Sequence, residues 1–143
     1  MEKALEQAAI ARSIGETPVG CVITENGKII AAGYNRRESD QNAASHAEMA
    51  AIKTACEKTG FWRLTECELY VTLEPCPMCA GAIINSRIKR VVFGAFDKKS
   101  GAFGSVINLN DFPFNHKPEV TGGVLAERSS AMLSAFFRGL REK

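Results

Sequence analysis

The sequence LEPCPMCAG, residues 73–81, marks the point at which an apolar run turns into a helix. The run Glu68–Leu73 favours a buried strand. Pro77 suits the first turn of a helix, where its missing N–H costs nothing, so we expect a helix over 77–85. The next apolar run, Arg90–Gly94, predicts another strand. A strand, a helix and a strand in this order favour a parallel crossover within one sheet.

The chain before this unit predicts a helix, a hairpin and a second helix. Apolar residues recur at near-helical spacing over residues 2–14. Two predicted strands, 19–24 and 28–34, flank Asn26-Gly27, which is the strongest short signal for a hairpin. The sheet is therefore expected to start antiparallel. Residues 46–58 predict the second helix.

The chain after this unit begins with a long connection. Residues 97–117 have no clear periodicity, and a connection of this length inside a domain is usually functional. We expect a short strand near Val120 and then a last helix with a broad apolar stripe from Leu125 to Leu140. Together these elements predict one α/β domain over residues 1–143, built as α/β/α layers.

The composition excludes several classes of protein. The chain has 143 residues, 45% of them hydrophobic and 24% charged, which is typical of a globular domain. Its net charge of +2 is too small for a polybasic binder, so any nucleic-acid contact must be local. No apolar run is long enough to cross a bilayer, and the first residues do not resemble a signal peptide. We therefore expect a cytoplasmic protein without a membrane partner, whose five cysteines are reduced thiols or metal ligands.

Three residues in two clusters predict a zinc site. His46 stands at the predicted start of one helix, and Cys76 and Cys79 stand at the start of another. A spacing of three places both sulfurs on one face of a helical turn, where they can bind one tetrahedral zinc ion. Three protein ligands leave a fourth position for water, which is typical of a catalytic rather than a structural site. We therefore expect one Zn²⁺ per chain.

Each cluster taken alone allows another interpretation. Ser45-His46-Ala47-Glu48 is also a good capping box, in which Glu48 would accept a hydrogen bond from the Ser45 amide. A lone Cys-x-x-Cys fits redox chemistry as well as zinc. The combination of His-x-Glu with Pro-Cys-x-x-Cys is, however, the signature of zinc-dependent deaminases. Cys21 and Cys56 are expected in the core, Cys67 at the start of a strand, and His116 in a loop-anchoring hydrogen bond rather than on the metal.

The signature also predicts the chemistry. Zinc lowers the pKa of a bound water molecule from about 15.7 to about 7. Glu48, close to that water but not a ligand, can take its proton and deliver it to a ring nitrogen and then to the departing amine. Glu48 is therefore the candidate catalytic residue, and the products are a ring carbonyl and ammonia.

The likeness to known proteins extends beyond these residues. The stretches TLEPCPMCAGAIINSRI (72–88) and VVFGA (91–95), with Pro18-Val19-Gly20 and Phe136-Phe137-Arg138, closely resemble the bacterial tRNA-specific adenosine deaminases of the cytidine deaminase superfamily. The resemblance covers nearly the whole chain. It implies a cytidine deaminase-like fold with a mixed five-stranded sheet, a homodimer, and conversion of adenosine to inosine at the wobble position of a tRNA anticodon stem-loop.

The resemblance also suggests substrate contacts. It implies that Asn35 contacts the flipped base and that Asp97 lies beside the neighbouring nucleotides. Without it, Asn35 is equally well a turn residue that closes a strand, and Asp97 a solvated turn. Phe137 and Arg138 in the last helix offer the aromatic and cationic groups that bind bases and phosphates, although the Phe136-Phe137 pair would also suit the core.

Two other functions compete with this interpretation. A deaminase of a free nucleobase or nucleoside, such as guanine, cytosine or adenosine, would share the same metal site. A zinc-stabilised RNA-binding module would not turn over a substrate, and Glu48 argues against it because a structural site has no use for a proton shuttle. The last helix favours an RNA substrate over a free base.

Overall fold

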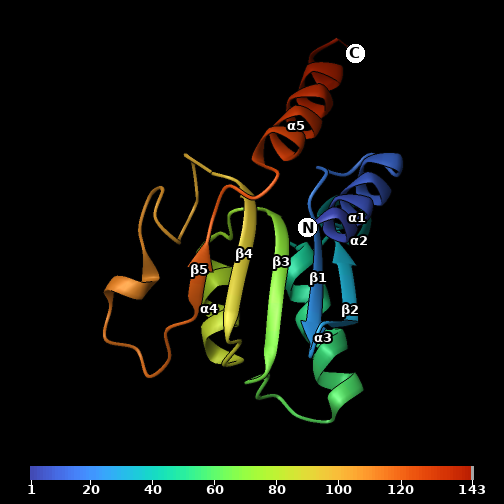
Figure 1. The fold of residues 1–143 in the computed structure, drawn as a ribbon. Helices are drawn as coiled ribbons and strands as arrows, with labels where there is room; N and C mark the ends of the chain where they lie inside the picture. Colours follow the sequence, from blue (N-terminus) through green and yellow to red (C-terminus); the bar gives the residue numbers. More distant parts are fainter. Residues whose placement is uncertain (143) are drawn as a thin grey trace.

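A five-stranded mixed sheet forms the centre of the molecule in the computed structural model, which describes residues 1–142 (Figure 1). The strand order is β2-β1-β3-β4-β5; β1 pairs antiparallel with β2 and β3, whereas the β3–β4 and β4–β5 pairs are parallel. The strands are β1 (Gly20–Glu25), β2 (Lys28–Tyr34), β3 (Cys67–Leu73), β4 (Arg90–Ala95) and β5 (Glu119–Thr121). The predicted α/β fold with an antiparallel start and a parallel second half is confirmed.

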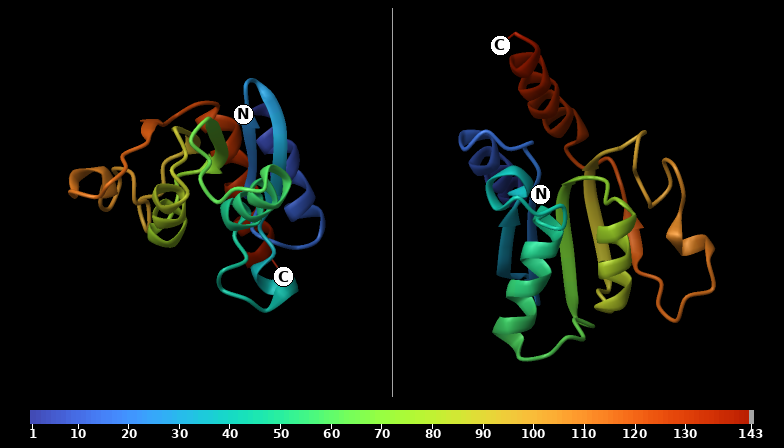
Figure 2. Two further views of the ribbon diagram at one scale, coloured as in Figure 1. Left: turned by 90° about the horizontal axis from the view of Figure 1, so that it is seen from below. Right: turned by 180° about the vertical axis from the view of Figure 1, so that it is seen from behind.

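Helices cover both faces of the sheet. The longer ones are α1 (Glu2–Ser13), α3 (Ala47–Thr59), α4 (Pro77–Asn85) and α5 (Ala126–Arg141). Figure 2 shows α3 and α4 side by side on one face. α1 and α5 pack on the other face, and α5 extends beyond the end of the sheet (Figure 1). This arrangement gives the three expected layers.

Glycines set the distance between the layers. A Cβ atom on Gly20 would lie 2.1 Å from the Ala4 carbonyl oxygen of α1, and one on Gly33 would lie 2.5 Å from the Ala47 carbonyl oxygen of α3. These contacts allow the backbone of each helix to touch the sheet directly, which only glycine permits. The start of α3 is therefore fixed closely against β2.

Local signals account for most of the observed boundaries. Asn26 and Gly27 have φ values of 52° and 78° and close the β1–β2 hairpin, as a two-residue turn of this kind requires. The predicted helix 77–85 is confirmed at both ends, and the other long helices and the strands begin and end within one or two residues of the predicted ranges. Two short elements were not predicted: α2 (Arg37–Asp40) in the polar stretch after β2, and a 3₁₀ helix, η1 (Leu109–Asp111), in the long connection.

The topology brings the site residues to one edge of the sheet. β2, β3 and β4 run in the same direction, so their carboxyl ends lie together. The segments that follow them lead to the start of α3, to the start of α4 and into the long connection. Such an edge, where chains leave parallel strands in different directions, is the usual place for a binding site in α/β folds.

Among residues 1–142, no helix is both long and apolar enough to cross a membrane.

Candidate active site

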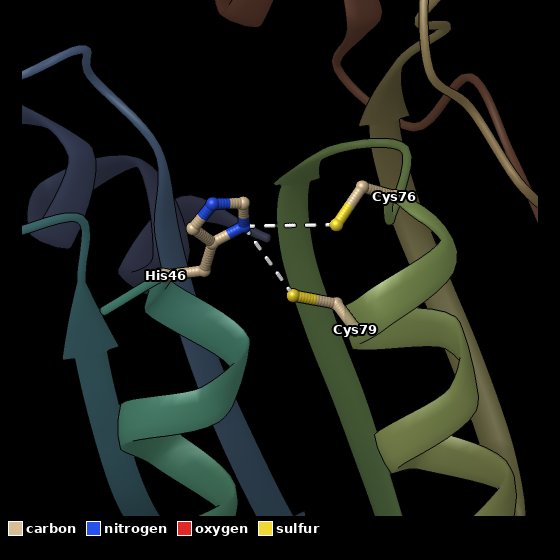
Figure 3. Close-up of side chains that lie close together, drawn as sticks. All are labelled: His46, Cys76 and Cys79. Carbon is tan, nitrogen blue, oxygen red and sulfur yellow. Dashed lines mark hydrogen bonds between the residues drawn. The ribbon is translucent and has the colours of Figure 1, made fainter. Parts of the chain in front are cut away.

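The candidate metal ligands meet between the first turns of α3 and α4 (Figure 3). His46 is the residue before α3, Cys76 is the residue before α4, and Cys79 is the third residue of α4. The His46 Nδ1 atom is 3.7 Å from the Cys76 sulfur and 3.5 Å from the Cys79 sulfur. The three donor atoms lie within 4.8 Å of one another. Sequence spacing thus predicted a cluster that the fold assembles from segments 30 residues apart.

The spacing of the donors fits a tetrahedral ion. Zn–S and Zn–N bonds of about 2.3 and 2.0 Å at a tetrahedral angle place nitrogen and sulfur about 3.5 Å apart, which is close to the observed distances. Two sulfurs and an imidazole nitrogen are also the donors that zinc prefers. Within residues 1–142, this is the group of His, Cys, Asp and Glu side chains that is close enough to hold a metal ion.

The surroundings of the two cysteines favour a thiolate. A hydrogen bond from the Cys79 thiol, opposed by burial and assisted by His46, lowers the pKa of Cys76 to about 4. The same hydrogen bond to Cys76, together with burial, raises the pKa of Cys79. The hydrogen bond with Cys76 also raises the pKa of His46. Both sulfurs lie at the positive end of the α4 dipole, which stabilises the anionic form that a metal binds.

Glu48 is buried beside this cluster without a partner for one of its oxygens. Its side chain is 3% exposed, and its Oε1 atom has no hydrogen-bond partner among the described residues. Burial raises the pKa of Glu48 to about 7. A buried carboxyl oxygen without a partner is costly and therefore rare in structures, so it indicates a functional group that awaits a ligand or water.

The capping box that Ser45 and Glu48 could form is absent. The residue before α3 is His46 rather than Ser45, and no side chain caps that end. The Ser45 amide donates to the Asn42 carbonyl, and the Ser45 hydroxyl donates to Asp40. The capping interpretation of Glu48 is therefore wrong, because the Ser45 amide already has a partner.

A cavity of about 660 Å³ opens above the cluster. This volume lies within the usual range for a small-molecule site, roughly 300–1,000 Å³. Its walls come from the loop before β1, from the segments after β2, β3 and β4, and from α5. They include Thr17, Val19, Asn35, Arg37, His46, Glu48, Glu74, Cys76, Phe96, Asp97, Lys98, Lys99, Ser100, Leu133 and Phe137. Four predicted site residues that are far apart in sequence, Asn35, Glu48, Asp97 and Phe137, therefore share one cavity.

The side chains predicted to contact the substrate also have neighbours within the protein. The Asn35 side chain donates to the Thr17 carbonyl and accepts from the Arg37 amide, which leaves a second amide hydrogen and a second lone pair. Asp97 accepts from the Lys99 and Ser100 amides and from the Ser100 hydroxyl. Phe137 is 44% exposed at the cavity wall. Arg138 lies outside this cavity, in an adjoining hollow lined by Lys99, Leu133 and Arg141.

The remaining predicted side chains have structural environments. Cys21 and Cys67 are buried in the core, and Cys56 packs against it half-buried. His116 forms a 2.6 Å hydrogen bond through its Nε2 atom with the Ile88 carbonyl, as expected for a residue that anchors the loop. Sequence reasoning missed Glu74, a cavity residue whose only signal was an isolated acid between an apolar strand and Pro75.

The fold and the donor set define a class, the deaminases, and similarity to known proteins agrees. A family model described as MafB19-like deaminase matches residues 1–141. The tRNA-specific adenosine deaminase of Bacillus subtilis (strain 168) is 53% identical over 144 residues, which cover 100% of this chain and 89% of that protein. The chain belongs to the family of tRNA-specific adenosine deaminases.

Solved structures separate this family from a related one. A tRNA:A34 deaminase studied for A-to-I editing at the wobble position of transfer RNA superposes with a TM-score of 0.90 at 42% identity, covering 93% of this chain and 97% of that one. The guanine deaminase of Nitrosomonas europaea superposes with a TM-score of 0.79 at 27% identity, covering 94% and 81%. The chain is thus more similar to the tRNA enzyme than to this enzyme of a free base.

Proposed function

We propose that this protein converts adenosine to inosine at the wobble position of a tRNA anticodon stem-loop by hydrolytic deamination. The observation that carries the reaction type is the partnerless Glu48 oxygen in the same cavity as His46 and Cys76, two members of the donor cluster that Cys79 completes. The observation that favours tRNA is the 53% identity to a tRNA-specific adenosine deaminase along the full chain. Residues 1–143 would act as one deaminase domain, and a tRNA substrate places the reaction in the cytoplasm.

His46, Cys76 and Cys79 would hold one zinc ion per chain, with the fourth position open. Zinc bound there would activate water for attack on the reacting carbon at neutral pH. Glu48 would move the protons: its Oε1 atom has no hydrogen-bond partner among the described residues, so it can accept a proton and then pass it to the ring nitrogen and to the leaving amine. Burial of Glu48 keeps that transfer away from bulk solvent.

Asn35 and Asp97 would orient the nucleotide. The free amide hydrogen and lone pair of Asn35 suit the edge of a base that has left its stack. Asp97 forms the turn that presents the neighbouring lysines at the cavity mouth. An unpaired anticodon loop is the RNA element from which a base can be extruded at the lowest cost.

The phosphates would be bound by cations around the cavity. Lys98, Lys99 and Arg37 line the cavity, and Arg138 and Arg141 line the adjoining hollow next to Phe137. Because the net charge of the chain is only +2, these local cations would have to attract the RNA phosphates. Phe137 would stack against a base of the loop.

We also propose that two copies of the chain form a homodimer. Several large apolar side chains are exposed, among them Phe61 at 70%, Trp62 at 53% and Val106 at 53%. The resemblance to the family implies the dimer, and the adjacent side chains of Phe61 and Trp62 are a candidate part of its interface.

The decisive experiment compares substrates and salt. Ammonia release is measured from an anticodon stem-loop and from free adenosine, cytosine and guanine. If about four phosphates are contacted, log affinity for the stem-loop falls with log salt at a slope near −3. The variant Arg138→Ala is expected to raise KM for the stem-loop and leave any slow reaction on free adenosine unchanged.

Arg128→Ala is the matched control for this experiment. Arg128 lies on the same helix, but it pairs with Glu2 of α1 instead of lining the hollow, so its loss should leave KM unchanged. Turnover that is insensitive to salt, with free bases processed as well as the stem-loop, would instead identify a nucleobase deaminase.

A further inference from the structure

Glu74 binds a single loop through both of its carboxylate oxygens. Its side chain is 2% exposed and lies directly after β3. Oε1 accepts hydrogen bonds from the Asp97 amide at 3.1 Å and from the Ser105 hydroxyl. Oε2 accepts from the Phe103 and Ser105 amides, each at 3.1 Å. All four donors belong to residues 97–105, which we call the Glu74 loop.

The Glu74 loop is built around this carboxylate. A Cβ atom on Gly101 would lie 2.3 Å from the carboxyl carbon of Glu74, so no side chain fits at that position. The Ala102 amide donates to the Pro75 carbonyl at 2.9 Å, which ties the loop to the residue next to Glu74. Buried charges require partners, and here the partners are the otherwise unpaired amides of an irregular segment. Charge and loop conformation therefore stabilise each other.

The same loop carries cavity residues. Asp97, Lys98, Lys99 and Ser100 all line the cavity. The Asp97 amide is held by Glu74, and the Asp97 carboxylate in turn accepts from the Lys99 amide at 3.0 Å and the Ser100 amide at 3.2 Å. The backbone of the two exposed lysines is thus fixed through Asp97 to a buried group, while no hydrogen bond or ion pair within residues 1–142 holds their ammonium groups.

We infer that Glu74 is a positioning residue for the RNA backbone: it holds the Glu74 loop so that Lys98 and Lys99 meet the phosphates beside the target base. The inference rests on the proposed function. Glu74 is not a member of the donor cluster, and all four hydrogen bonds of its carboxylate come from the Glu74 loop, so its effect on Lys98 and Lys99 passes through Asp97. A loop that is already ordered binds a charged strand without a further cost in conformational entropy, whereas a loosened loop must be ordered on binding.

The test is Glu74→Gln. An amide has one acceptor oxygen, so its NH₂ group must replace one carboxylate oxygen and face donors instead of accepting from them. The fewest donors lose their acceptor if the NH₂ group takes the place of Oε1, which accepts from the Asp97 amide and the Ser105 hydroxyl. The Ser105 hydroxyl can rotate and accept a hydrogen bond from the NH₂ group, so only the Asp97 amide is left without a partner. We expect KM for the stem-loop to rise about tenfold, with kcat falling by less than about threefold. If both lysine contacts weaken, the salt slope becomes shallower by about 1.4.

Three further measurements separate positioning from general damage. Amide hydrogen exchange should accelerate at Asp97, Phe103 and Ser105 in Glu74→Gln, whatever the substrate. The zinc content should match that of the wild type, which excludes an effect through Cys76. Glu74→Asp keeps both oxygens and the charge, so it should restore KM partly towards the wild-type value and stays informative should the glutamine variant fail to fold.

Leu64→Ala is the control for lost stability. Leu64 is buried in the core before β3, at the opposite end of that strand from Glu74. The Leu64→Ala variant should have a lower melting temperature than the wild type and an unchanged KM and salt slope for the stem-loop. Wild-type turnover of the stem-loop reports on the proposed function, and the ratio of variant to wild type reports on Glu74. An active wild type with an unchanged KM and salt slope in Glu74→Gln would overturn the inference.

Discussion

Two glutamates of the cavity, Glu48 and Glu74, are equally buried but differ in their hydrogen bonds. Glu48 is 3% exposed and has an oxygen with no hydrogen-bond partner among the described residues, whereas Glu74 is 2% exposed and accepts four hydrogen bonds. Both lie at the same edge of the sheet, each within two residues of a candidate metal ligand. The difference between them is therefore in their hydrogen bonds and not in their location.

This difference distinguishes chemistry from architecture. A buried carboxyl oxygen without a hydrogen-bond partner reduces stability and remains reactive, because no donor in the protein satisfies its lone pairs. A carboxylate with four donors stabilises the segment that supplies them and has no capacity left for a substrate. We therefore assign proton transfer to Glu48 and positioning of the Glu74 loop to Glu74.

The largest effect on turnover is expected from removing a metal ligand, because Glu48 can transfer protons from an activated water only if the donor cluster holds zinc. Cys79→Ala should lower the zinc content from one ion per chain towards zero and abolish turnover. Elemental analysis of the purified variant checks this. Cys67→Ala, a buried cysteine at the opposite end of β3, is the control and should keep its zinc. Full zinc occupancy in Cys79→Ala would refute the site.

Glu48→Gln should separate activity from stability. We expect the single-turnover rate to fall about 10²- to 10⁴-fold, because a positioned proton shuttle contributes that much. The free energy of unfolding should stay the same or rise, since the Oε1 atom of Glu48 has no hydrogen bond to lose. Glu74→Gln should show the reverse, a loss of about 1–3 kcal/mol from a stranded amide with a smaller change in kcat.

Melting curves and single-turnover rates on the same two preparations make this comparison. A capping role for Glu48 would appear as a loss of about 1 kcal/mol with turnover intact. If both variants lost rate and stability in equal measure, the distinction between the two glutamates would not hold.

The features predicted from the sequence are those with local causes. Asn26-Gly27 closes a hairpin and Pro77 begins a helix through their own backbone preferences. Cys76 and Cys79 share one face of a helical turn because they are three residues apart, and the combination of this pair with His46-x-Glu48 identified the site. The fold as a whole followed from such signals and from the resemblance to the family.

The features that the sequence did not predict depend on distant partners. Glu74 receives its donors from residues 23 to 31 positions later. The short helix α2 owes its first turn to Glu16, which lies 22 residues before its nearer donor, Glu38. No pattern of neighbouring residues encodes such contacts.

The smallest effect is expected at Glu16, a third buried carboxylate that resembles Glu74. It is 1% exposed and accepts from the amides of Glu38 at 3.1 Å and Ser39 at 2.6 Å, at the start of α2. Burial alone would raise the pKa of Glu16, but the hydrogen bonds from Ser39 and Glu38 outweigh it and lower the pKa below the ordinary value of 4.5. The folded state therefore binds the proton of Glu16 less readily than the unfolded state does.

This lowered pKa fixes the pH dependence of the Glu16 contribution. A group whose pKa is lower in the folded state stabilises the protein above its unfolded pKa, and the stabilisation is lost as the pH falls through the folded pKa. Glu16→Gln should cost about 1 kcal/mol at pH 7, and the difference from the wild type should shrink below a pH of about 4.5. Urea unfolding at a series of pH values measures this difference in the free energy of unfolding, and the metal site, common to both proteins, cancels in it.

Glu6→Gln, which changes an exposed glutamate of α1, is the control and should stay within about 0.5 kcal/mol of the wild type at every pH. A Glu16→Gln difference that is constant with pH would show that the hydrogen bonds to α2 do not depend on the charge of Glu16, and the resemblance between Glu16 and Glu74 would end there.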